Sequence, residues 1–276
     1  MEPWQIIAIV LAALLVFCVT SVLVVVFPQW KASEKRRKQV RIWDKGEVKM
    51  IAHRGLSGLY MENTLPAFEA AGQRSYYGIE TDVHVTKDGK FIVAHDDDLK
   101  RIAGLDIVIE ETTYEELRAL RFKDMNGKSE EKNLYLPSLN EYIEVCKKYD
   151  KQAILELKNE MKAEEVWAIA EAIKAQGWYE RTTFISFAGE NLLRLREKYA
   201  DADAQFLAED STDEEIEFMI QNKLDADLCW THLTKAKVDR LHAAGLKVNC
   251  WTVDGRVCAT LIKSCGVDFI TSNILE

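Results

Sequence analysis

The sequence predicts an α/β fold: a TIM (β/α)8 barrel with a small insertion after its second strand, preceded by one amino-terminal transmembrane helix. Beyond Gly46, eight short apolar runs alternate with longer amphipathic segments, which is the pattern of parallel strands separated by helices. The chain has 276 residues, and a barrel of this kind needs roughly 250. Polar residues stand at the ends of several apolar runs, where a barrel gathers its functional groups.

The amino-terminal segment is apolar for long enough to cross a bilayer. Residues 4–27 are almost continuously aliphatic or aromatic, and about 20 such residues at 1.5 Å each span the hydrocarbon layer. A cleaved signal peptide would begin with basic residues and end in small ones, which this segment lacks. Lipidation of Cys18 would need similar small residues before it. We therefore expect residues 1–30 to form a transmembrane anchor in the cell membrane.

A basic segment, residues 31–46, follows the anchor. Up to Lys45 it contains seven basic and two acidic residues, whereas residues 1–3, ahead of the apolar run, include no basic one. The positive-inside rule then predicts that the following domain, residues 47–276, lies in the cytoplasm. The segment is either a solvated linker or, because of its position beside the bilayer, a site of attraction to anionic lipid headgroups.

The charge of the main body excludes one class of partner. Of the net charge of −9, residues 1–30 contribute −1 and residues 31–45 contribute +5, which leaves −13 for the remainder. A body this acidic is not expected to bind nucleic acid. An acidic enzyme that acts on anionic phosphates needs a compensating cation or local Arg and Lys residues. The six cysteines include no C-x-x-C pair, so neither a zinc site nor a redox motif is indicated.

The body shows the regular elements of one barrel. Its predicted strands are residues 49–53, 78–85, 153–157, 183–187, 204–207, 226–229, 247–251 and 269–271. Its predicted helices, with apolar residues every three or four positions, are residues 65–74, 138–148, 163–175, 190–199, 213–221, 235–243 and 255–264.

The alternation is interrupted after the second strand. Lys87-Asp88-Gly89 predicts a turn into another extended run, residues 91–95. A polar insertion, about residues 97–136, follows with one plausible helix at residues 113–120. Long segments at this end of a barrel commonly form a lid or a substrate rim.

Acidic side chains on two neighbouring predicted strands point to a metal site. Glu80 and Asp82 are one residue apart, so both side chains face the same side of a strand, about 6.5 to 7 Å apart. Glu156 and Lys158 repeat this spacing on the next barrel strand. Three converging carboxylates favour one bound hard cation, Ca²⁺ or Mg²⁺. The structural alternative is a layer of ion pairs in which Arg54 and Lys158 neutralise the acids.

Two histidines close predicted strands at the same end of the barrel. His53 precedes Arg54, and His95 precedes Asp96. Histidine titrates near neutral pH, so a pair placed beside the carboxylates predicts proton transfer to and from a substrate. His84 shares the strand face of Glu80 and Asp82 and is a third, weaker candidate whose role the sequence leaves open.

A series of motifs resembles the glycerophosphodiester phosphodiesterase family. They follow the family's order over residues 49–276: H-R-G at His53, E-N-T at Glu62, E-T-D-V-H-V-T-K-D-G from Glu80, V-A-H-D ending at Asp96, L-P-S-L-N-E from Leu136, L-E-L-K from Leu155, S-F at Ser186, W-T-V-D from Trp251 and G-V-D-F-I-T-S-N from Gly266. Three positions depart from the family pattern: Met61 stands where proline is frequent, Asp254 where asparagine is frequent, and residues 101–104 lack the usual threonines.

The resemblance implies a role for each matching residue. His53 and His95 would be the general acid and base, and Glu80, Asp82 and Glu156 would bind the metal ion. The phosphate oxygens would be bound by Arg54 and Lys158. Trp251 would form an apolar wall for the glycerol or a lipid chain, unless it is only a core aromatic residue.

The resemblance also implies a reaction. The expected activity is metal-dependent hydrolysis of glycerophosphodiesters to sn-glycerol 3-phosphate and an alcohol, through a cyclic phosphate. One alternative is a lysophospholipase D that acts on lysophospholipids. The predicted anchor and the insertion favour this alternative. Another is a catalytically silent membrane scaffold or lipid-binding module. The lipid bilayer is an expected partner, and the sequence does not identify a protein partner.

Overall fold

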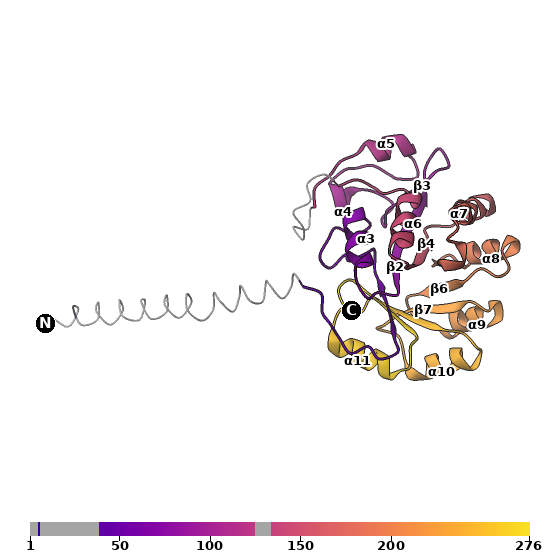
Figure 1. Ribbon diagram of the computed structural model, residues 1–276. Coiled ribbons are helices and arrows are strands. Elements are labelled where there is room, and N and C mark those ends of the chain that lie inside the picture. Colours follow the sequence, from indigo (N-terminus) through magenta and orange to yellow (C-terminus); the bar gives the residue numbers. More distant parts are fainter. Residues whose placement is uncertain (1–4, 6–38, 125–133) are drawn as a thin grey trace. The chain divides into compact units, whose positions relative to one another are not determined.

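The computed structural model describes residue 5 and residues 39–124 and 134–276 (Figure 1). Val40–Glu276 form one compact unit. Within it, short strands lie at the centre and helices surround them, as a β/α barrel requires.

The strands agree with the sequence-based prediction to within one or two residues. They are β1 (Lys49–Ala52), β2 (Gly78–Val85), β3 (Phe91–Val93), β4 (Gln152–Leu157), β5 (Thr182–Ser186), β6 (Ala204–Ala208), β7 (Asp225–Cys229), β8 (Val248–Trp251) and β9 (Phe269–Ser272). Both candidate histidines stand just beyond a strand, because β1 ends at Ala52 and β3 ends at Val93.

Eight strands form a nearly closed parallel barrel in the order β8-β7-β6-β5-β4-β2-β1-β9. β3 lies outside this ring and pairs antiparallel with β2. Single hydrogen bonds join β8 to β9 in place of a regular ladder: Asp268 N donates to Val248 O at 2.9 Å, and Val253 N donates to Thr271 O at 3.0 Å. The carboxyl ends of all eight barrel strands therefore meet at one rim.

The helices also occur where the sequence predicts them. They are α3 (Leu65–Gly72), α5 (Tyr114–Ala119), α6 (Leu139–Lys148), α7 (Ala163–Ala175), α8 (Gly189–Lys198), α9 (Asp213–Asn222), α10 (Lys235–Ala243) and α11 (Arg256–Ser264). The sequence does not predict two short elements, α4 (Lys100–Ala103) and η2 (Tyr179–Arg181). Each of these is too short to show a helical period.

Two apolar cores hold the barrel together. The strands enclose a small inner core of Ile51, Ile154, Ile185, Leu207 and Phe269. A larger core fills the space between strands and helices, where the buried faces of the helices pack against the outside of the barrel. Two of the five inner-core residues, Ile185 and Leu207, also line a cavity among the polar strand-end residues.

The insertion has a core of its own. Its residues Leu99, Ile109, Leu117 and Leu136 are buried together with Ile92 of β3. Asp98 forms a β-bridge with Val108, and Phe122 forms one with Leu134. In Figure 1, β3, α4 and α5 lie together on one side of the barrel. The insertion is therefore a packed subdomain at the rim in the part that the structure describes.

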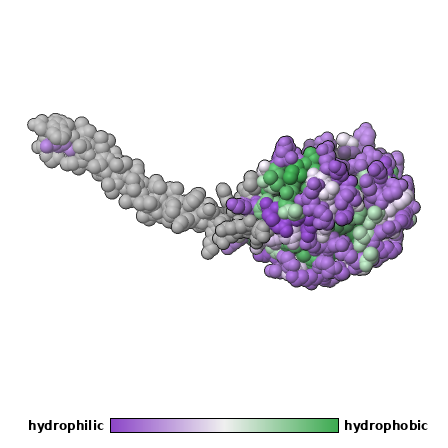
Figure 2. All heavy atoms as spheres, turned by 90° about the horizontal axis from the view of Figure 1, so that it is seen from above, coloured by the Kyte–Doolittle hydropathy of each residue, from purple (hydrophilic) through white to green (hydrophobic). Residues whose placement is uncertain are grey.

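The predicted anchor, residues 1–30, lies outside the described residues apart from Gln5, so it stays a prediction. No helix within the described ranges is both long and apolar enough to span a bilayer. The end of the basic segment contacts the barrel: Arg41 N donates to Ile274 O and Trp43 N donates to Glu276 O, each at 3.0 Å. The face shown in Figure 2 is mostly hydrophilic, with apolar residues in limited patches.

Candidate active site

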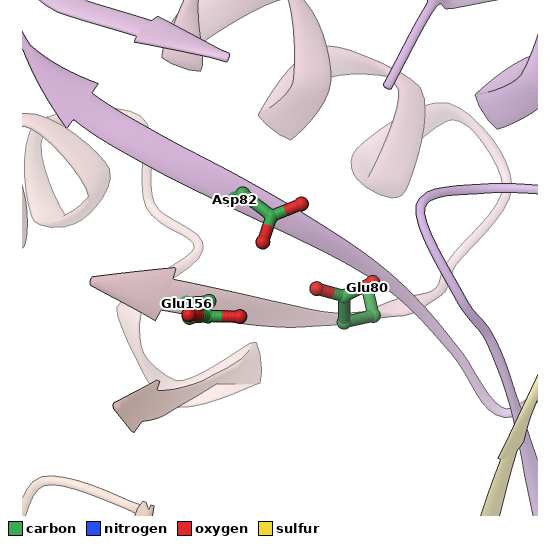
Figure 3. A group of neighbouring side chains, drawn as sticks. All are labelled: Glu80, Asp82 and Glu156. Carbon is green, nitrogen blue, oxygen red and sulfur yellow. The ribbon is translucent and has the colours of Figure 1, made fainter. Parts of the chain in front are cut away.

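Glu80, Asp82 and Glu156 converge as the strand spacing predicts. Glu80 and Asp82 lie on β2, and Glu156 lies on β4 directly opposite Asp82 in the ladder (Figure 3). One carboxylate oxygen from each residue lies within 4.8 Å of the other two. All three side chains are buried. The register of two parallel strands therefore places three carboxylates around one point.

Two cations contact this cluster. Arg54 Nε lies 3.6 Å from Asp82 Oδ2, and Lys158 Nζ lies 2.8 Å from Glu156 Oε1. The Arg54 backbone N–H donates to Glu80 Oε2 at 2.6 Å, and Asn63 Nδ2 donates to Asp82 Oδ2 at 2.7 Å. These contacts include the ion pairs that the structural alternative requires. The question is whether the two cations are sufficient for three carboxylates.

The pKa values of the three carboxyl groups indicate that the two cations do not neutralise all three. Burial and the charge of Asp82 raise the pKa of Glu80 well above its usual range and raise the pKa of Glu156 to about 8. Burial also opposes ionisation of Asp82, but the charges of Arg54, His95 and Lys158 outweigh it and hold the pKa of Asp82 below its usual range. Asp82 Oδ1 is buried and accepts no hydrogen bond from a described residue.

This set of donors fits a hard divalent cation. Oxygen ligands of this kind suit Ca²⁺ and Mg²⁺, and a further positive charge would relieve the repulsion that raises the pKa values of Glu80 and Glu156. Asp82 Oδ1 has no hydrogen-bond partner among the described residues and lies 3.7 Å from Lys158 Nζ, so it is available as a ligand atom. The cluster can therefore bind a metal ion, and the donors alone do not choose between Ca²⁺ and Mg²⁺.

His53 is held by the carboxyl end of β9. Its Nδ1 lies 2.8 Å from Asn273 Oδ1, and the Asn273 amide donates to Asp254 Oδ2 at 2.7 Å. Because the amide presents its oxygen to the ring, Nδ1 carries the proton in the neutral imidazole and Nε2 is the acceptor. Burial and the charge of Arg54 lower the pKa of His53 to about 4. His53 is therefore a neutral base at physiological pH.

His95 is held by the insertion. Its Nδ1 lies 2.7 Å from Asp96 Oδ1. Arg101 of α4 donates to Asp96 through Nε at 2.6 Å and to Glu62 through Nη2 at 2.7 Å. Glu62 in turn accepts from Arg54 at 2.8 Å. Burial and the charges of Arg54 and Lys158 lower the pKa of His95, and the charge of Asp82 and the hydrogen bond to Asp96 oppose that change only in part.

A cavity of about 260 Å³ opens at the rim between these groups. We define its histidine half by the lining residues His53, Arg54, Glu80, His95 and Glu156. We define its aromatic half by the lining residues Ile185, Phe187, Leu207, Glu209, Asp227, Trp251 and Thr252, at or just after β5 to β8. The cavity thus joins the predicted acid/base pair, two predicted metal ligands and the predicted Trp251 wall.

Three predicted residues lie apart from the lining. Asp82 has no exposed surface and does not line the cavity, and Lys158 contacts Glu156 without lining it. The role predicted for Lys158 in phosphate binding stays a prediction. His84 is fully buried and faces Glu110 of the insertion at 3.1 Å, so it does not reach the cavity as described.

Sequence reasoning left out several residues of the site. Asn273 and Glu62 belong to the matched motifs, but their contacts with His53 and Arg101 depend on how distant loops meet. Asp227 was identifiable, because an acidic residue at an inward position of a barrel strand requires an explanation. Asp254, one of the departures from the family pattern, accepts from Ser272, from the Asn273 backbone and from the Asn273 side chain.

Comparison with known proteins agrees with the geometry. The model of the glycerophosphoryl diester phosphodiesterase family matches residues 53–275. A glycerophosphodiester phosphodiesterase of Bacillus altitudinis is 46% identical over 71 residues, which cover 26% of this chain and 29% of the relative. The human lysophospholipase D GDPD1 is 35% identical over 101 residues, which cover 37% of this chain and 30% of the relative. The chain thus spans less than two thirds of the length of these relatives.

The fold has solved counterparts over more of its length. The structure of an Oleispira antarctica phosphodiesterase in complex with the product sn-glycerol-3-phosphate superimposes with a TM-score of 0.75 at 28% identity. That superposition covers 82% of this chain and 93% of the other.

Proposed function

The chain belongs to the glycerophosphoryl diester phosphodiesterase family, and on that premise we propose that it hydrolyses glycerophosphodiesters to sn-glycerol 3-phosphate and an alcohol. It is a phosphoric diester hydrolase of the glycerophosphodiester phosphodiesterase type. One observation carries this proposal: both histidines line the same cavity as Glu80 and Glu156, and an oxygen of Asp82 lies within 4.8 Å of theirs. The product found in the Oleispira antarctica enzyme supports the assignment of the substrate.

In the first step, His53 is the general base. Its Nε2 takes the proton from the substrate's own glycerol 2-hydroxyl, and the 2-oxygen attacks phosphorus. The bond from phosphorus to the departing alcohol breaks as His95, whose imidazolium is stabilised by Asp96, gives its proton to the alcohol oxygen. The product that stays bound is a cyclic glycerophosphate.

In the second step, the two histidines exchange roles. His95, now neutral, takes a proton from water, and the water oxygen attacks phosphorus. The ring bond to the 2-oxygen breaks, and His53 returns a proton to that oxygen, which releases sn-glycerol 3-phosphate and restores both histidines. Arg54, which lines the cavity, orients the phosphate oxygens throughout.

We propose that Glu80, Asp82 and Glu156 hold one divalent cation. When bound, the cation supplies positive charge against the phosphate oxygens, where negative charge increases in the transition state. The raised pKa values of Glu80 and Glu156 support a requirement for such a charge.

The proposal is tested with the full chain in detergent. Glycerophosphocholine, glycerophosphoethanolamine and glycerophosphoglycerol are incubated with the protein, with Ca²⁺, with Mg²⁺ or with chelator, and release of sn-glycerol 3-phosphate is measured enzymatically. We expect turnover that chelator abolishes and that one of the two ions restores. If no diester is hydrolysed with either ion, the proposal fails, and the result favours the alternative of a catalytically silent membrane scaffold or lipid-binding module.

A second candidate substrate is a lysophospholipid. The human relative named lysophospholipase D and the predicted membrane anchor favour it. The product would be lysophosphatidic acid or its cyclic form. Release of choline from lysophosphatidylcholine, compared with release from glycerophosphocholine at equal concentration, separates the two substrates. Exclusive action on the water-soluble diester rejects the lipid version.

We further propose that residues 1–30 anchor the enzyme in the cell membrane with the barrel in the cytoplasm. The long apolar segment and the basic residues after it support this topology. Alkaline carbonate extraction of membranes and protease protection of intact cells test it. We expect the chain to stay with the membrane pellet and the barrel to be protected. Release by carbonate, or cleavage of the barrel from outside, contradicts the proposal.

A further inference from the structure

The aromatic half of the cavity has no role in the proton transfers described above. It lies at the ends of β5 to β8, across the barrel from His95 and the carboxylate cluster. It joins the histidine half without interruption, so a phosphodiester bound between the histidines extends one of its two organic groups into it. The composition of this half therefore bears on which group is bound there.

Two aromatic rings form its wall. The rings of Phe187 and Trp251 lie 5.6 Å apart at an angle of 88°. The Trp251 indole is fixed because Nε1 donates to Asp227 O at 3.1 Å. Phe187 is 46% exposed, which is high for a large apolar side chain next to a barrel strand. Aromatic faces in such a corner attract a cation as well as apolar carbon.

Two carboxylates complete it. Asp227 is only 2% exposed, and its Oδ1 has no hydrogen-bond partner among the described residues, although Asp227 lines the cavity. Burial raises the pKa of Asp227 to about 7, so a positive charge beside it would be strongly favourable. Glu209 is exposed at the same side and forms no ion pair with any described residue.

The described cations of the site, Arg54 and Lys158, lie on the histidine side of the cavity. Arg54 pairs with Glu62 and Asp82, and Lys158 pairs with Glu156. No Lys or Arg of the described ranges lines the aromatic half. The cavity is therefore divided by charge, with a phosphate-binding side at the histidines and a side of aromatic rings and carboxylates opposite.

We propose that the aromatic half is a subsite for a cationic amino-alcohol headgroup, such as choline or ethanolamine, and that the enzyme prefers zwitterionic glycerophosphodiesters. The proposal rests on the proposed function and names its substrate class. The substrate's phosphate and ammonium are joined by a two-carbon link, which suits neighbouring sites of opposite charge. A neutral glycerol end would need hydrogen-bond partners but would gain nothing from two carboxylates without a cation.

The kinetic test compares two diesters that share glycerol and phosphate. Glycerophosphocholine releases a cationic alcohol, and glycerophosphoglycerol releases a neutral one. We expect the full chain to have a kcat/KM at least about tenfold higher for glycerophosphocholine, a ratio typical of one cation–π or ion-pair contact. Asp227→Asn and Glu209→Gln should each lower this ratio severalfold. Asp210→Asn, which removes the adjacent exposed charge outside the cavity lining, is the matched control and should keep it.

Three results overturn the proposal. The first is a wild-type ratio near one. The second is an equal loss on both diesters in Asp227→Asn, which would mean that Asp227 binds the glycerol end. The third is that Asp210→Asn lowers the ratio as much as Glu209→Gln, which would mean that only the surface field matters.

Calorimetric titration with choline chloride separates this proposal from the proposed function. We expect the full chain to bind choline and Asp227→Asn to bind it several times more weakly. If neither diester is hydrolysed but choline binds in this way, the reaction is wrong and the cationic subsite stands. If both diesters are hydrolysed and choline does not bind at millimolar concentration, the subsite is wrong and the reaction stands.

Discussion

The two halves of the cavity differ in how their polar groups are satisfied. In the histidine half, His53 and His95 each have a hydrogen-bond partner that is itself held by further residues. In the aromatic half, Asp227 is buried and its Oδ1 has no hydrogen-bond partner among the described residues, and Glu209 has no ion-pair partner there. A half whose groups are already oriented suits chemistry, because the orientation costs nothing at the moment of reaction. The half with two carboxylates and no described cation suits a positively charged ligand.

The largest effect should come from the histidines. His53→Ala and His95→Ala should each lower kcat by about 10³-fold or more, because each removes one proton-transfer group. Steady-state assays on glycerophosphocholine measure this, with His242→Ala, a half-exposed histidine paired with Asp268 away from the cavity, as the control. Near-wild-type turnover in either variant would show that this histidine transfers no proton and would rule out the acid/base assignment.

The next effect should come from the residue that orients His53. Asn273→Ala should lower kcat by roughly 10- to 100-fold with little change in KM, because Nδ1 loses the acceptor that fixes the tautomer. Asp254→Asn keeps Asn273 near its place and should cost less. If the stabilisation of the fold by added metal ion were lost together with kcat, Asn273 would be a structural residue, not one that positions His53.

A smaller effect should come from the insertion. Arg101→Gln removes the cation that holds Asp96 and Glu62, and kcat should fall by about tenfold because Arg101 is half exposed and its contacts are partly screened. Lys100→Gln, which removes the neighbouring charge that pairs with Asp106, is the matched control. Equal losses in the two variants would show that the insertion acts through general charge, with no specific hold on His95.

The last effect concerns stability in place of turnover, and it should be a gain from the aromatic half. Asp227 has a pKa of about 7 in the folded state against 3.8 as the ordinary value, so the unfolded chain gives up its proton first and stability falls as pH rises between about 4 and 7. Asp227→Asn removes that loss, at most about 4 kcal/mol. Thermal melts without ligand should show the variant several degrees more stable at pH 8 and little changed at pH 4. An equal change at both pH values would contradict a buried carboxyl group with a raised pKa at this position.

The sequence predicted the parts of the site that depend on local spacing. Glu80 and Asp82 share a face because side chains alternate along β2, and the register with β4 brings Glu156 opposite. The strand ends located both histidines. The sequence did not predict the residues that hold them. Asn273 reaches His53 only because the last barrel strand closes against the first, and Arg101 lies on a four-residue helix without a recognisable period.

In the amino-terminal region, the prediction depends on composition and not on the spacing of particular residues. Its transmembrane helix is predicted from composition alone, and residues 6–38 lie outside the described ranges. From residue 39 onward the structure describes the end of the basic segment, in which Arg41 and Trp43 contact the carboxyl-terminal residues. These contacts involve only the barrel, and carbonate extraction and protease protection test the membrane topology of the segment before it.

A crystal structure of the full chain with Ca²⁺ and sn-glycerol 3-phosphate tests the central claim most directly. The account predicts one ion bound by Glu80, Asp82 and Glu156, with the phosphate between His53 and His95 and in contact with Arg54. An ion bound elsewhere, or a carboxylate cluster closed by Arg54 and Lys158 with the phosphate outside the cavity, would contradict it.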